Sequence, residues 1–390
     1  MPFQEIPLKL LEPAWKSQLA SIILELEKLR TKRIGGPVPP KVFFQIKNIF
    51  QMLESLGSAR IEGNRTTLAE FVEKVIEGSN KKVDDEKMKE ISNLERAINY
   101  IEESVKPHTQ ITRALLSDIH KIIVHELTPA PLGEGSRTPG QYRTISISIQ
   151  KSNIINPDPI QVPRYMEELL EFINAQVEPK NDLLVTALSH HRMAWIHPFD
   201  NGNGRMVRML TYALLIKQGF KVKSGRILNP TAIFCMDRQG YYDQLALADT
   251  GEEEKVFQWC EYVLGGLLGE IQKIDQLLDV EFMIEKILIP AIHFALEREL
   301  ITTRESTILF GTVKQQGMMI KSEQVQQFTG ERSPVQRSRI IRRLKDRHML
   351  IPLEKKGRVY TIGFANNYLL RGIINALEKN NFIPASLNIK

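Results

Sequence analysis

The sequence has only two cysteines, Cys235 and Cys260, among its 390 residues. Two thiols form neither a disulfide framework nor a zinc cluster, so we expect both to be packing residues. Long apolar runs are also missing. No segment approaches the ~20 uncharged apolar residues of a membrane-spanning helix, and residues 1–30 lack the apolar centre of a signal peptide. These absences predict a cytoplasmic protein with no membrane partner.

Positive charge is unevenly distributed along the chain. The whole sequence carries a formal charge of +6, yet residues 321–371 contain twelve Lys or Arg against four Asp or Glu. That segment therefore carries +8, and the remainder sums to −2. The basicity belongs to the C-terminal segment alone. With 42% hydrophobic residues, the chain is also long enough to build more than one domain.

Apolar residues recur at helical spacing through most of the sequence, which predicts a mainly helical protein. Residues 128–163 differ because Pro and Gly are frequent there, and Ile145, Ile147 and Ile149 alternate with serines. Strict alternation predicts a short strand or hairpin, which would form a flap beside the helices. The helices that we expect before residue 220 span 14–31, 41–56, 66–77, 85–105, 109–126, 164–176, 181–196 and 204–218.

The C-terminal segment predicts three helices, at 304–316, 322–328 and 333–347, followed by strands at 349–353 and 359–362. Three helices and a small hairpin are the plan of a winged helix-turn-helix. The density of cations on the third helix and in the hairpin suits DNA phosphates. The alternative is a solvated basic helix that binds another protein. The residues expected to contact DNA are Arg337, Arg339, Arg342, Arg343, Lys356 and Arg358.

The most informative stretch is 197–208, HPFDNGNGRMVR. Gly202 and Gly204 allow successive backbone N–H groups to face one anion, and the helical spacing that follows predicts a helix N-terminus, which attracts phosphate. Arg205 and Arg208 are three residues apart and share a face of that helix, where both suit phosphate oxygens. His197 is the side chain of this stretch that takes up a proton near neutrality. The pattern indicates phosphate-bond chemistry with a histidine base.

This stretch resembles the signature of the Fic (filamentation induced by cAMP) family, His-x-Phe-x-(Asp/Glu)-Gly-Asn-Gly-Arg-x-x-Arg, at seven of its eight defined positions. The resemblance covers roughly residues 40–265 and includes Gly140-Gln141-Tyr142-Arg143 before the flap. It implies a helical core and transfer of AMP from ATP to a Tyr, Thr or Ser hydroxyl of a target protein. A second copy of this chain is one candidate target.

The resemblance also implies roles for individual residues. His197 would be the general base, and Arg208 would hold the γ-phosphate. Tyr241 and Tyr242 would line the nucleotide pocket, with core packing as the alternative. The α- and β-phosphates would be held by Gly202, Asn203, Gly204 and Arg205. The flap residues Thr144, Ile145, Ser146 and Ile147 would align the target segment as an added strand.

One position departs from the family pattern. The acidic residue that binds Mg²⁺ in the family corresponds to Asn201, while Asp200 occupies the neighbouring variable position. Mg²⁺ prefers charged oxygen ligands, so a carboxamide should hold it less well. Asn201 and Asp200 are therefore candidate metal ligands, and the metal requirement and the transferred group stay open.

Residues 58–63, Ser-Ala-Arg-Ile-Glu-Gly, resemble the family's inhibitory motif, (Ser/Thr)-x-x-x-Glu-(Gly/Asn). The motif consists here of Ser58, Glu62 and Gly63. The resemblance implies that Glu62 pairs with Arg208 and thereby excludes the γ-phosphate of ATP. Because the motif precedes the core, inhibition would be intramolecular.

Three hypotheses follow. The first is a self-inhibited protein adenylyltransferase. The second is a Fic-type enzyme that transfers another phosphate-bearing group or removes AMP, with Glu62 positioning water. The third is a DNA-binding regulator whose weakly active Fic core senses nucleotide. In each case we expect an N-terminal helical region (1–105), a Fic core (106–265), a helical connector (266–303) and a winged helix-turn-helix domain (304–390). Assembly into a homo-oligomer is compatible with all three.

Overall fold

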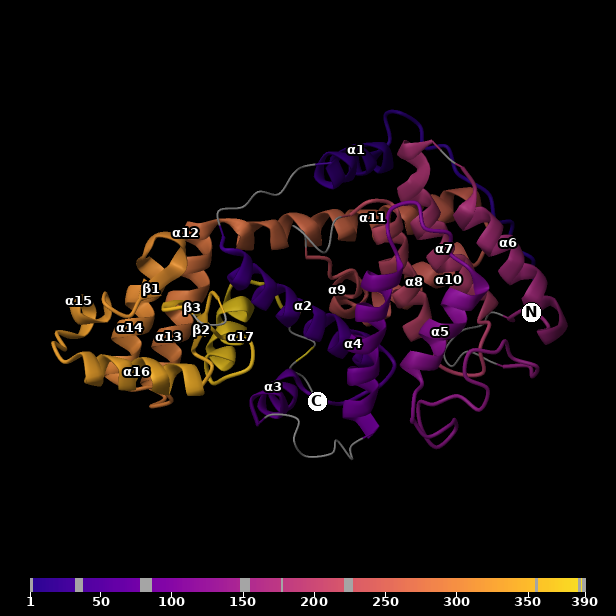
Figure 1. The fold of residues 1–390 in the computed structure, drawn as a ribbon. Helices are drawn as coiled ribbons and strands as arrows, with labels where there is room; N and C mark the ends of the chain where they lie inside the picture. Colours follow the sequence, from indigo (N-terminus) through magenta and orange to yellow (C-terminus); the bar gives the residue numbers. More distant parts are fainter. Residues whose placement is uncertain are drawn as a thin grey trace. The chain divides into compact units, whose positions relative to one another are not determined.

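The computed structural model describes residues 3–31, 38–77, 86–147, 155–176, 178–220, 227–354, 357–384 and 387. It is mainly helical with a small sheet, which confirms the prediction from apolar spacing (Figure 1). No helix among the described residues combines the length and apolar composition that a membrane crossing needs. The chain divides into two compact units, drawn from residues 1–34, 54–65 and 83–271 and from residues 35–53, 66–82 and 272–390.

The division into units does not follow the chain in a simple order. The region expected at 1–105 contributes to both units, and helix α2 (Pro40–Ile61) has residues in each. The four-region division stays a prediction. The other helices of the first unit are α1 (Gln18–Thr31), α4 (Glu86–Ser104), α5 (Arg113–Ile123), α6 (Val162–Asn174), α7 (Asp182–Ile196), α8 (Asn203–Lys217), α9 (Thr231–Met236), α10 (Arg238–Ala248) and α11 (Glu253–Asp275), with short 3-10 turns at Pro159–Gln161 and Pro179–Asn181.

Helices α7 and α8 form the centre of the first unit (Figure 1). They pack on each other, with α6 against α7 and with α4 and α5 against α8. Almost every residue of both helices is buried, including the polar Thr186, Ser189 and Thr211. A helix that is enclosed on all sides has no polar stripe facing solvent, unlike a surface helix. The link between α7 and α8 is the 197–202 stretch, so the candidate site is fixed by two buried helices.

The strand predicted at 145–149 is wrong over its described part. Residues 144–147 are irregular backbone, while 148 and 149 lie outside the described residues. The Arg143 guanidinium donates a hydrogen bond to the Ile145 carbonyl at 3.0 Å, so a residue directly before this segment holds its backbone. Thr144, Ile145 and Ser146 are exposed, and a strand forms only where another strand pairs with it. The alternating residues 145–147 therefore form no strand, because no strand in the described part of the chain pairs with them.

The second unit contains a three-stranded sheet. β1 (Met319–Lys321), β2 (Leu350–Pro352) and β3 (Val359–Ile362) form an antiparallel sheet in the order β1-β3-β2, with Leu350 opposite Ile362. The two predicted strands are confirmed, whereas β1 was not predicted because three residues are too few to show a period. The helices of this unit are the first part of α2, α3 (Leu68–Glu77), α12 (Val280–Phe282), α13 (Ile289–Glu297), α14 (Thr303–Lys314), α15 (Val325–Thr329), α16 (Pro334–Asp346) and α17 (Leu369–Lys379), with a π-helical stretch at Met283–Leu288 and 3-10 turns at Gln276–Leu278 and Gln316–Met318.

Helix α17 was also missed by the sequence analysis, although it packs closely on α13. A Cβ atom on Gly372 would lie 2.5 Å from the Ala291 carbonyl oxygen, so the two backbones meet at a residue without a side chain. The other buried residues of α17 are all apolar and lie on the face that it turns toward the unit. The unit therefore has an apolar core of its own.

Candidate active site

His197 lies where α7 ends. It caps the helix in the left-handed conformation (φ 51°, ψ 62°), which turns the chain sharply toward α8. Its Nδ1 lies 3.2 Å from the Ala194 carbonyl oxygen, so Nδ1 carries the proton and Nε2 keeps its lone pair. Burial lowers the pKa of His197 to about 4, against the smaller raising effects of the Ala194 carbonyl and Glu62. The imidazole is therefore neutral at pH 7 and able to act as a base.

The turn after His197 is closed by Asn203. Its side chain accepts a hydrogen bond from the Phe199 N–H at 2.9 Å and donates one to the Phe199 carbonyl at 2.8 Å. Gly202 takes a positive φ of 76°, which a residue without Cβ adopts at no steric cost. Helix α8 then begins at Asn203, so its first N–H groups form the end that favours anions.

The anion side of this turn is occupied by Glu62. A Cβ atom on Gly204 would collide with the Glu62 carboxylate, so the carboxylate lies directly against the first turn of α8. Glu62 Oε1 is 2.7 Å from Arg208 Nη2. Burial alone would raise the pKa of Glu62, but the charge and hydrogen bond of Arg208 lower it below its usual range. Glu62 is thus an ionised carboxylate in the place where the sequence predicts phosphate.

Ser58 holds Arg208 from the other side. Arg208 Nε donates to the Ser58 hydroxyl at 2.8 Å, and Nη2 donates to the Ser58 carbonyl at 2.9 Å. The Arg208 side chain is only 1% exposed. Gly63 follows Glu62 with φ 111°, a conformation that favours glycine and ends α2. The structure therefore brings the inhibitory motif, Ser58, Glu62 and Gly63, against Arg208. Glu62 and Arg208, which form the ion pair, are 146 residues apart in the sequence.

The two candidate metal ligands are bound to the 128–137 loop. Asp200 accepts from the Ser136 hydroxyl at 2.5 Å and from the Arg137 N–H at 2.8 Å, one bond on each carboxylate oxygen. The Asn201 amide donates to the Gly135 carbonyl at 3.0 Å, and its oxygen accepts from the Gly202 N–H at 2.8 Å. Among the described residues no group of three or more Asp, Glu, His or Cys side chains is placed to hold a metal. Asp200 and Asn201 are thus engaged by this loop in the structure, and their role as Mg²⁺ ligands stays a prediction.

The sequence analysis missed His120 of α5 as a site residue. Its ring stacks on Phe199 at 3.8 Å between centroids. The Gly140 N–H donates to His120 Nδ1 at 2.8 Å, so Nε2 carries the proton and donates to the Asn201 carbonyl at 3.0 Å. Burial lowers the pKa of His120 to about 4. This neutral ring thus connects Gly140, which precedes the flap, to Asn201 in the turn after His197. A histidine on an apolar helix face gave no signal of that role.

Arg143 belongs to the stretch before the flap that resembles the family, and the sequence did not indicate a role for it in the site. Its Nε donates to the His197 carbonyl at 2.8 Å, and its backbone N–H donates to the Pro198 carbonyl at 2.8 Å. The side chain is 2% exposed. Arg143 thus fixes the backbone of the candidate base from the flap side.

Tyr241 and Tyr242 lie on α10. Tyr241 is buried among Phe234, Trp259 and His190, and its hydroxyl is 2.9 Å from His190 Nε2. These contacts are core packing, the alternative that the sequence analysis kept. Tyr242 is partly exposed, with its hydroxyl 3.5 Å from the Ile61 carbonyl. Nucleotide contacts of both tyrosines stay predictions.

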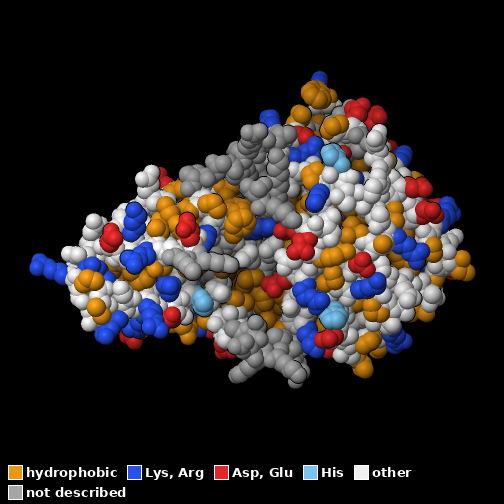
Figure 2. Space-filling view, viewed as in Figure 1, with side chains coloured by type: hydrophobic (Ala, Val, Ile, Leu, Met, Phe, Trp, Pro, Cys, Tyr) orange, Lys and Arg blue, Asp and Glu red, His pale blue; other side chains and the backbone are white. Residues whose placement is uncertain are grey.

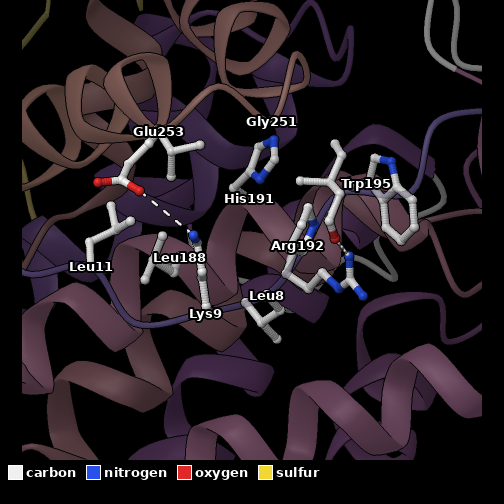
Figure 3. A pocket seen from close by; sticks show the side chains of 12 residues that line it. Leu8, Lys9, Leu11, Leu188, His191, Arg192, Trp195, Gly251 and Glu253 are labelled. Carbon is white, nitrogen blue, oxygen red and sulfur yellow. Dashed lines mark hydrogen bonds and ion pairs between the residues drawn. The ribbon is translucent and has the colours of Figure 1, made fainter.

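A small cavity of about 90 Å³ lies elsewhere in this unit, between the N-terminal segment and α7 (Figure 3). Leu8 and Leu11 face Leu188 and Trp195 across it. The polar groups around it are already paired: His191 Nε2 is 2.9 Å from Asp249 and Lys9 is 3.6 Å from Glu253. It is a packing gap under the N-terminal segment, and the histidine on its wall is structural.

The basic residues predicted to contact DNA differ in exposure. Arg339, Arg342 and Arg343 are exposed on α16, whereas Ile341 and Leu344 of the same helix are buried. Arg337 is partly buried and donates to the Glu331 and Arg332 carbonyls, which hold the turn before α16. Arg358 is exposed, and Lys356 lies outside the described residues. Figure 2 shows blue side chains gathered over α15 and α16.

The sequence from 110 to 215 matches the model of the Fic/DOC family. This range runs from the residues before α5 through the 197–208 signature to the end of α8. This range of the chain is similar in sequence to a Fic/DOC domain. Within it lie His197, both signature arginines and the two positioning residues His120 and Arg143.

Relatives of known name are similar to about half of this chain. The chain is 28% identical over 199 residues to a protein adenylyltransferase Fic of Drosophila grimshawi, and 27% identical over 200 residues to one of Nematostella vectensis. Each match covers 50% of this chain but only 37% and 42% of those relatives, so the chain spans about two fifths of their length.

Two solved structures share the fold. A Fic family protein from Desulfovibrio desulfuricans G20 is similar with a TM-score of 0.56 and 18% identity, and the match covers 91% of this chain and 98% of that one. A Fic domain containing signaling protein from Bacteroides thetaiotaomicron gives a TM-score of 0.52 and 16% identity, over 67% and 97% of the two chains. These similarities establish the fold of the Fic domain and its helical surroundings.

Proposed function

We propose that this chain is a self-inhibited protein adenylyltransferase that transfers AMP from ATP to a hydroxyl of a target protein. The observation that carries the proposal is the position of the Glu62 carboxylate, against Gly204 and 2.7 Å from Arg208. An anion already occupies the helix end where the triphosphate would bind. The names of the relatives support adenylyl transfer as the reaction.

The reaction needs a base, an anion site and an aligned hydroxyl. His197 Nε2 takes the proton of the target hydroxyl, whose oxygen forms a bond to the α-phosphorus as the bond to the β-phosphate oxygen breaks. Pyrophosphate leaves, and AMP remains on the target. The first N–H groups of α8 and Arg208 would neutralise the phosphate oxygens. Asp200 and Asn201 are engaged by the 128–137 loop, and no step of this scheme is assigned to Mg²⁺.

The exposed backbone of Thr144–Ile147 supports the predicted alignment of the target. This segment has no strand partner among the described residues, and an extended target segment would pair with the backbone groups other than the Ile145 carbonyl, which Arg143 already binds. Arg143 connects residues 144–147 to the His197 carbonyl. A target hydroxyl presented there would therefore be held in a fixed relation to the base.

Labelled ATP tests the proposal. Wild type and Glu62→Gly are incubated with ATP labelled at the α- or the γ-phosphate, together with cell extract or with the chain alone. We expect protein-bound label from the α-phosphate only, more of it in Glu62→Gly. Label from the γ-phosphate would instead select phosphate transfer. Loss of AMP from a previously labelled target, dependent on Glu62, would select AMP removal.

A second function is proposed for the C-terminal elements. We propose that α14 to β3 form a winged helix-turn-helix that binds duplex DNA. The order α14, β1, α15, α16, β2, β3 and the sheet order β1-β3-β2 support it, as does the exposure of Arg339, Arg342 and Arg343 on one helix. The exposed side of α16 would face the phosphates, since Ile341 and Leu344 anchor its other side.

Salt dependence tests this second function. The affinity of the full chain for a mixed-sequence duplex is measured by fluorescence anisotropy between about 50 and 200 mM salt. Over this range, the contribution of phosphate contacts to the affinity falls steeply as salt rises. We expect a steep fall in affinity with salt. No binding at the lowest salt concentration would exclude DNA and leave the basic helix as a protein interface. Binding of DNA without any transfer of AMP would favour the regulator hypothesis.

A further inference from the structure

Arg205, the first arginine of the signature, is enclosed by carboxylates. Its side chain is 0% exposed, with Nη1 3.1 Å from Glu90 Oε1. Nη2 donates to the Glu134 carbonyl at 2.6 Å and lies 3.3 Å from the Glu134 carboxylate. Glu90 comes from α4 and Glu134 from the loop that follows α5. A phosphate therefore meets Arg205 only after one of these carboxylates gives way.

The same Glu90 carboxylate is connected to the inhibitory turn. Asn64 lies two residues after Glu62, and its Nδ2 donates to Glu90 Oε2 at 2.8 Å and to the Lys87 carbonyl at 2.9 Å. The Asn64 backbone N–H donates to the Ala59 carbonyl at 3.1 Å, within the last turn of α2. Asn64 is 8% exposed. One oxygen of Glu90 thus binds the inhibitory turn and the other binds Arg205.

This arrangement is sensitive to the loss of either partner. Burial raises the pKa of Glu90 to about 7, although Arg205 and the Asn64 hydrogen bond both lower it. A carboxylate buried to this degree is stable as an anion only while its partners stay in place. Movement of Asn64 away from α4 would remove one of them. The position of the turn and the pairing of Arg205 are therefore energetically linked.

We infer that Asn64 and Glu90 are positioning residues that join the inhibitory turn to Arg205, so that both signature arginines are withheld from nucleotide, and released to it, together. Glu62 forms an ion pair with Arg208 directly, and Asn64 acts on Arg205 through its hydrogen bond to Glu90. The inference rests on the proposed inhibition by Glu62. It adds that the turn controls two cations instead of one.

The test is a double-mutant cycle on ATP binding, which does not require transfer. The dissociation constant of ATP is measured by calorimetry on the full chain carrying His197→Ala, so that ATP is not consumed. Glu62→Gly, Asn64→Ala and the combination of the two are compared. We expect Asn64→Ala alone to tighten ATP binding about tenfold, within the range of ordinary coupling between sites. In the Glu62→Gly background the same change should matter less than twofold, because the turn is already released.

Asn93→Ala is the matched control. Asn93 is a buried asparagine of α4, and its Nδ2 donates to the His125 carbonyl at 2.8 Å, without contact to the inhibitory turn. It should change ATP binding less than twofold. Asn64→Asp, which places a second carboxylate against Glu90, should act like Asn64→Ala and provides a second variant if the first does not fold.

The outcomes separate this inference from the proposed function. Equal effects of Asn64→Ala in both backgrounds, or none in either, would overturn the linkage. Coupled effects on ATP binding without any transfer of AMP by Glu62→Gly would retain the linkage and reject adenylyl transfer. If no variant binds ATP, both proposals are wrong.

Discussion

Arg208 in the first unit and Arg342 in the second are the same residue type in opposite surroundings. The Arg208 side chain is 1% exposed and lies 2.7 Å from Glu62, whereas that of Arg342 is 84% exposed and 3.8 Å from Asp346. A buried cation depends strongly on its carboxylate partner, because removing that partner leaves an uncompensated buried charge. An exposed cation is screened by salt and acts only as one of several. Single substitutions should therefore act strongly around α8 and weakly, but additively, along α16.

The strongest effect should come from the base. His197→Ala removes the group that accepts the target proton, and a positioned base contributes about 10²–10⁴-fold. We expect transfer of α-labelled AMP by the Glu62→Gly protein to fall by that factor. His125→Ala, at an exposed position in the same unit, should leave transfer unchanged. A His197→Ala protein that retains a tenth of the activity would show that another group is the base.

The next effect should come from the carboxylate that opposes Arg208. Removing it in Glu62→Gly frees the helix end and Arg208 for phosphate, so we expect transfer to rise about 5–150-fold, the usual size of a coupling between two ligands. Initial rates of AMP incorporation measure it. Glu103→Gly, an exposed carboxylate near the end of α4, is the control. Equal rates for wild type and Glu62→Gly would show that the ion pair is only structural.

Exposed arginines should give smaller effects that add. Arg339→Gln with Arg342→Gln should weaken binding of the duplex about tenfold and reduce the salt slope by about two, because each arginine that neutralises a phosphate contributes about one unit to that slope. Anisotropy titrations at several salt concentrations measure both. Arg298→Gln, at another exposed arginine of the same unit, should do neither. A weaker affinity with an unchanged slope would mean that these arginines do not touch phosphates.

The parts of the site that could be predicted are those with a fixed spacing in sequence. His197, Gly202 and Arg208 lie within twelve residues, and the turn geometry follows from them. The pairing of Glu62 with Arg208, 146 residues away, came from the resemblance and is present in the structure. Helix positions were predictable because α7 and α8 are largely apolar, although their ends shifted by a residue or more.

The parts that could not be predicted depend on tertiary contacts. Glu90 reads as a polar residue of an ordinary helix, and only the fold places it 3.1 Å from Arg205. Alternation at 145–149 predicted a strand, yet a strand forms only beside another strand, and the alternation alone does not show whether one is present. Asn201 looked like a weakened metal ligand. In the structure its bonds to Gly135 and Gly202 fasten the 128–137 loop to the turn, which the sequence did not indicate.

That structural role of Asn201 can be measured. Asn201→Asp keeps the shape of the side chain but loses the donor to the Gly135 carbonyl, so an anion faces a carbonyl oxygen. We expect the free energy of unfolding to fall by about 1 kcal/mol, the usual worth of a hydrogen bond. Urea denaturation without Mg²⁺ measures it, with Asn48→Asp, at an exposed position of α2, as the control. An Asp variant that is more stable than wild type would mean that the position is built for an acid.

The smallest effect should be that of mild acid on the base. Burial holds the pKa of His197 at about 4, and loss of Glu62 removes an influence that raises it. Protonation removes the lone pair only as the pH falls through that value, so kcat/KM of Glu62→Gly should change less than twofold between pH 8 and pH 5. A histidine with the ordinary pKa of about 6.5 would lose roughly 30-fold at pH 5. Circular dichroism at each pH separates unfolding from titration. A tenfold fall by pH 5 in a folded protein would show that His197 titrates like an exposed histidine and that its surroundings do not lower its pKa.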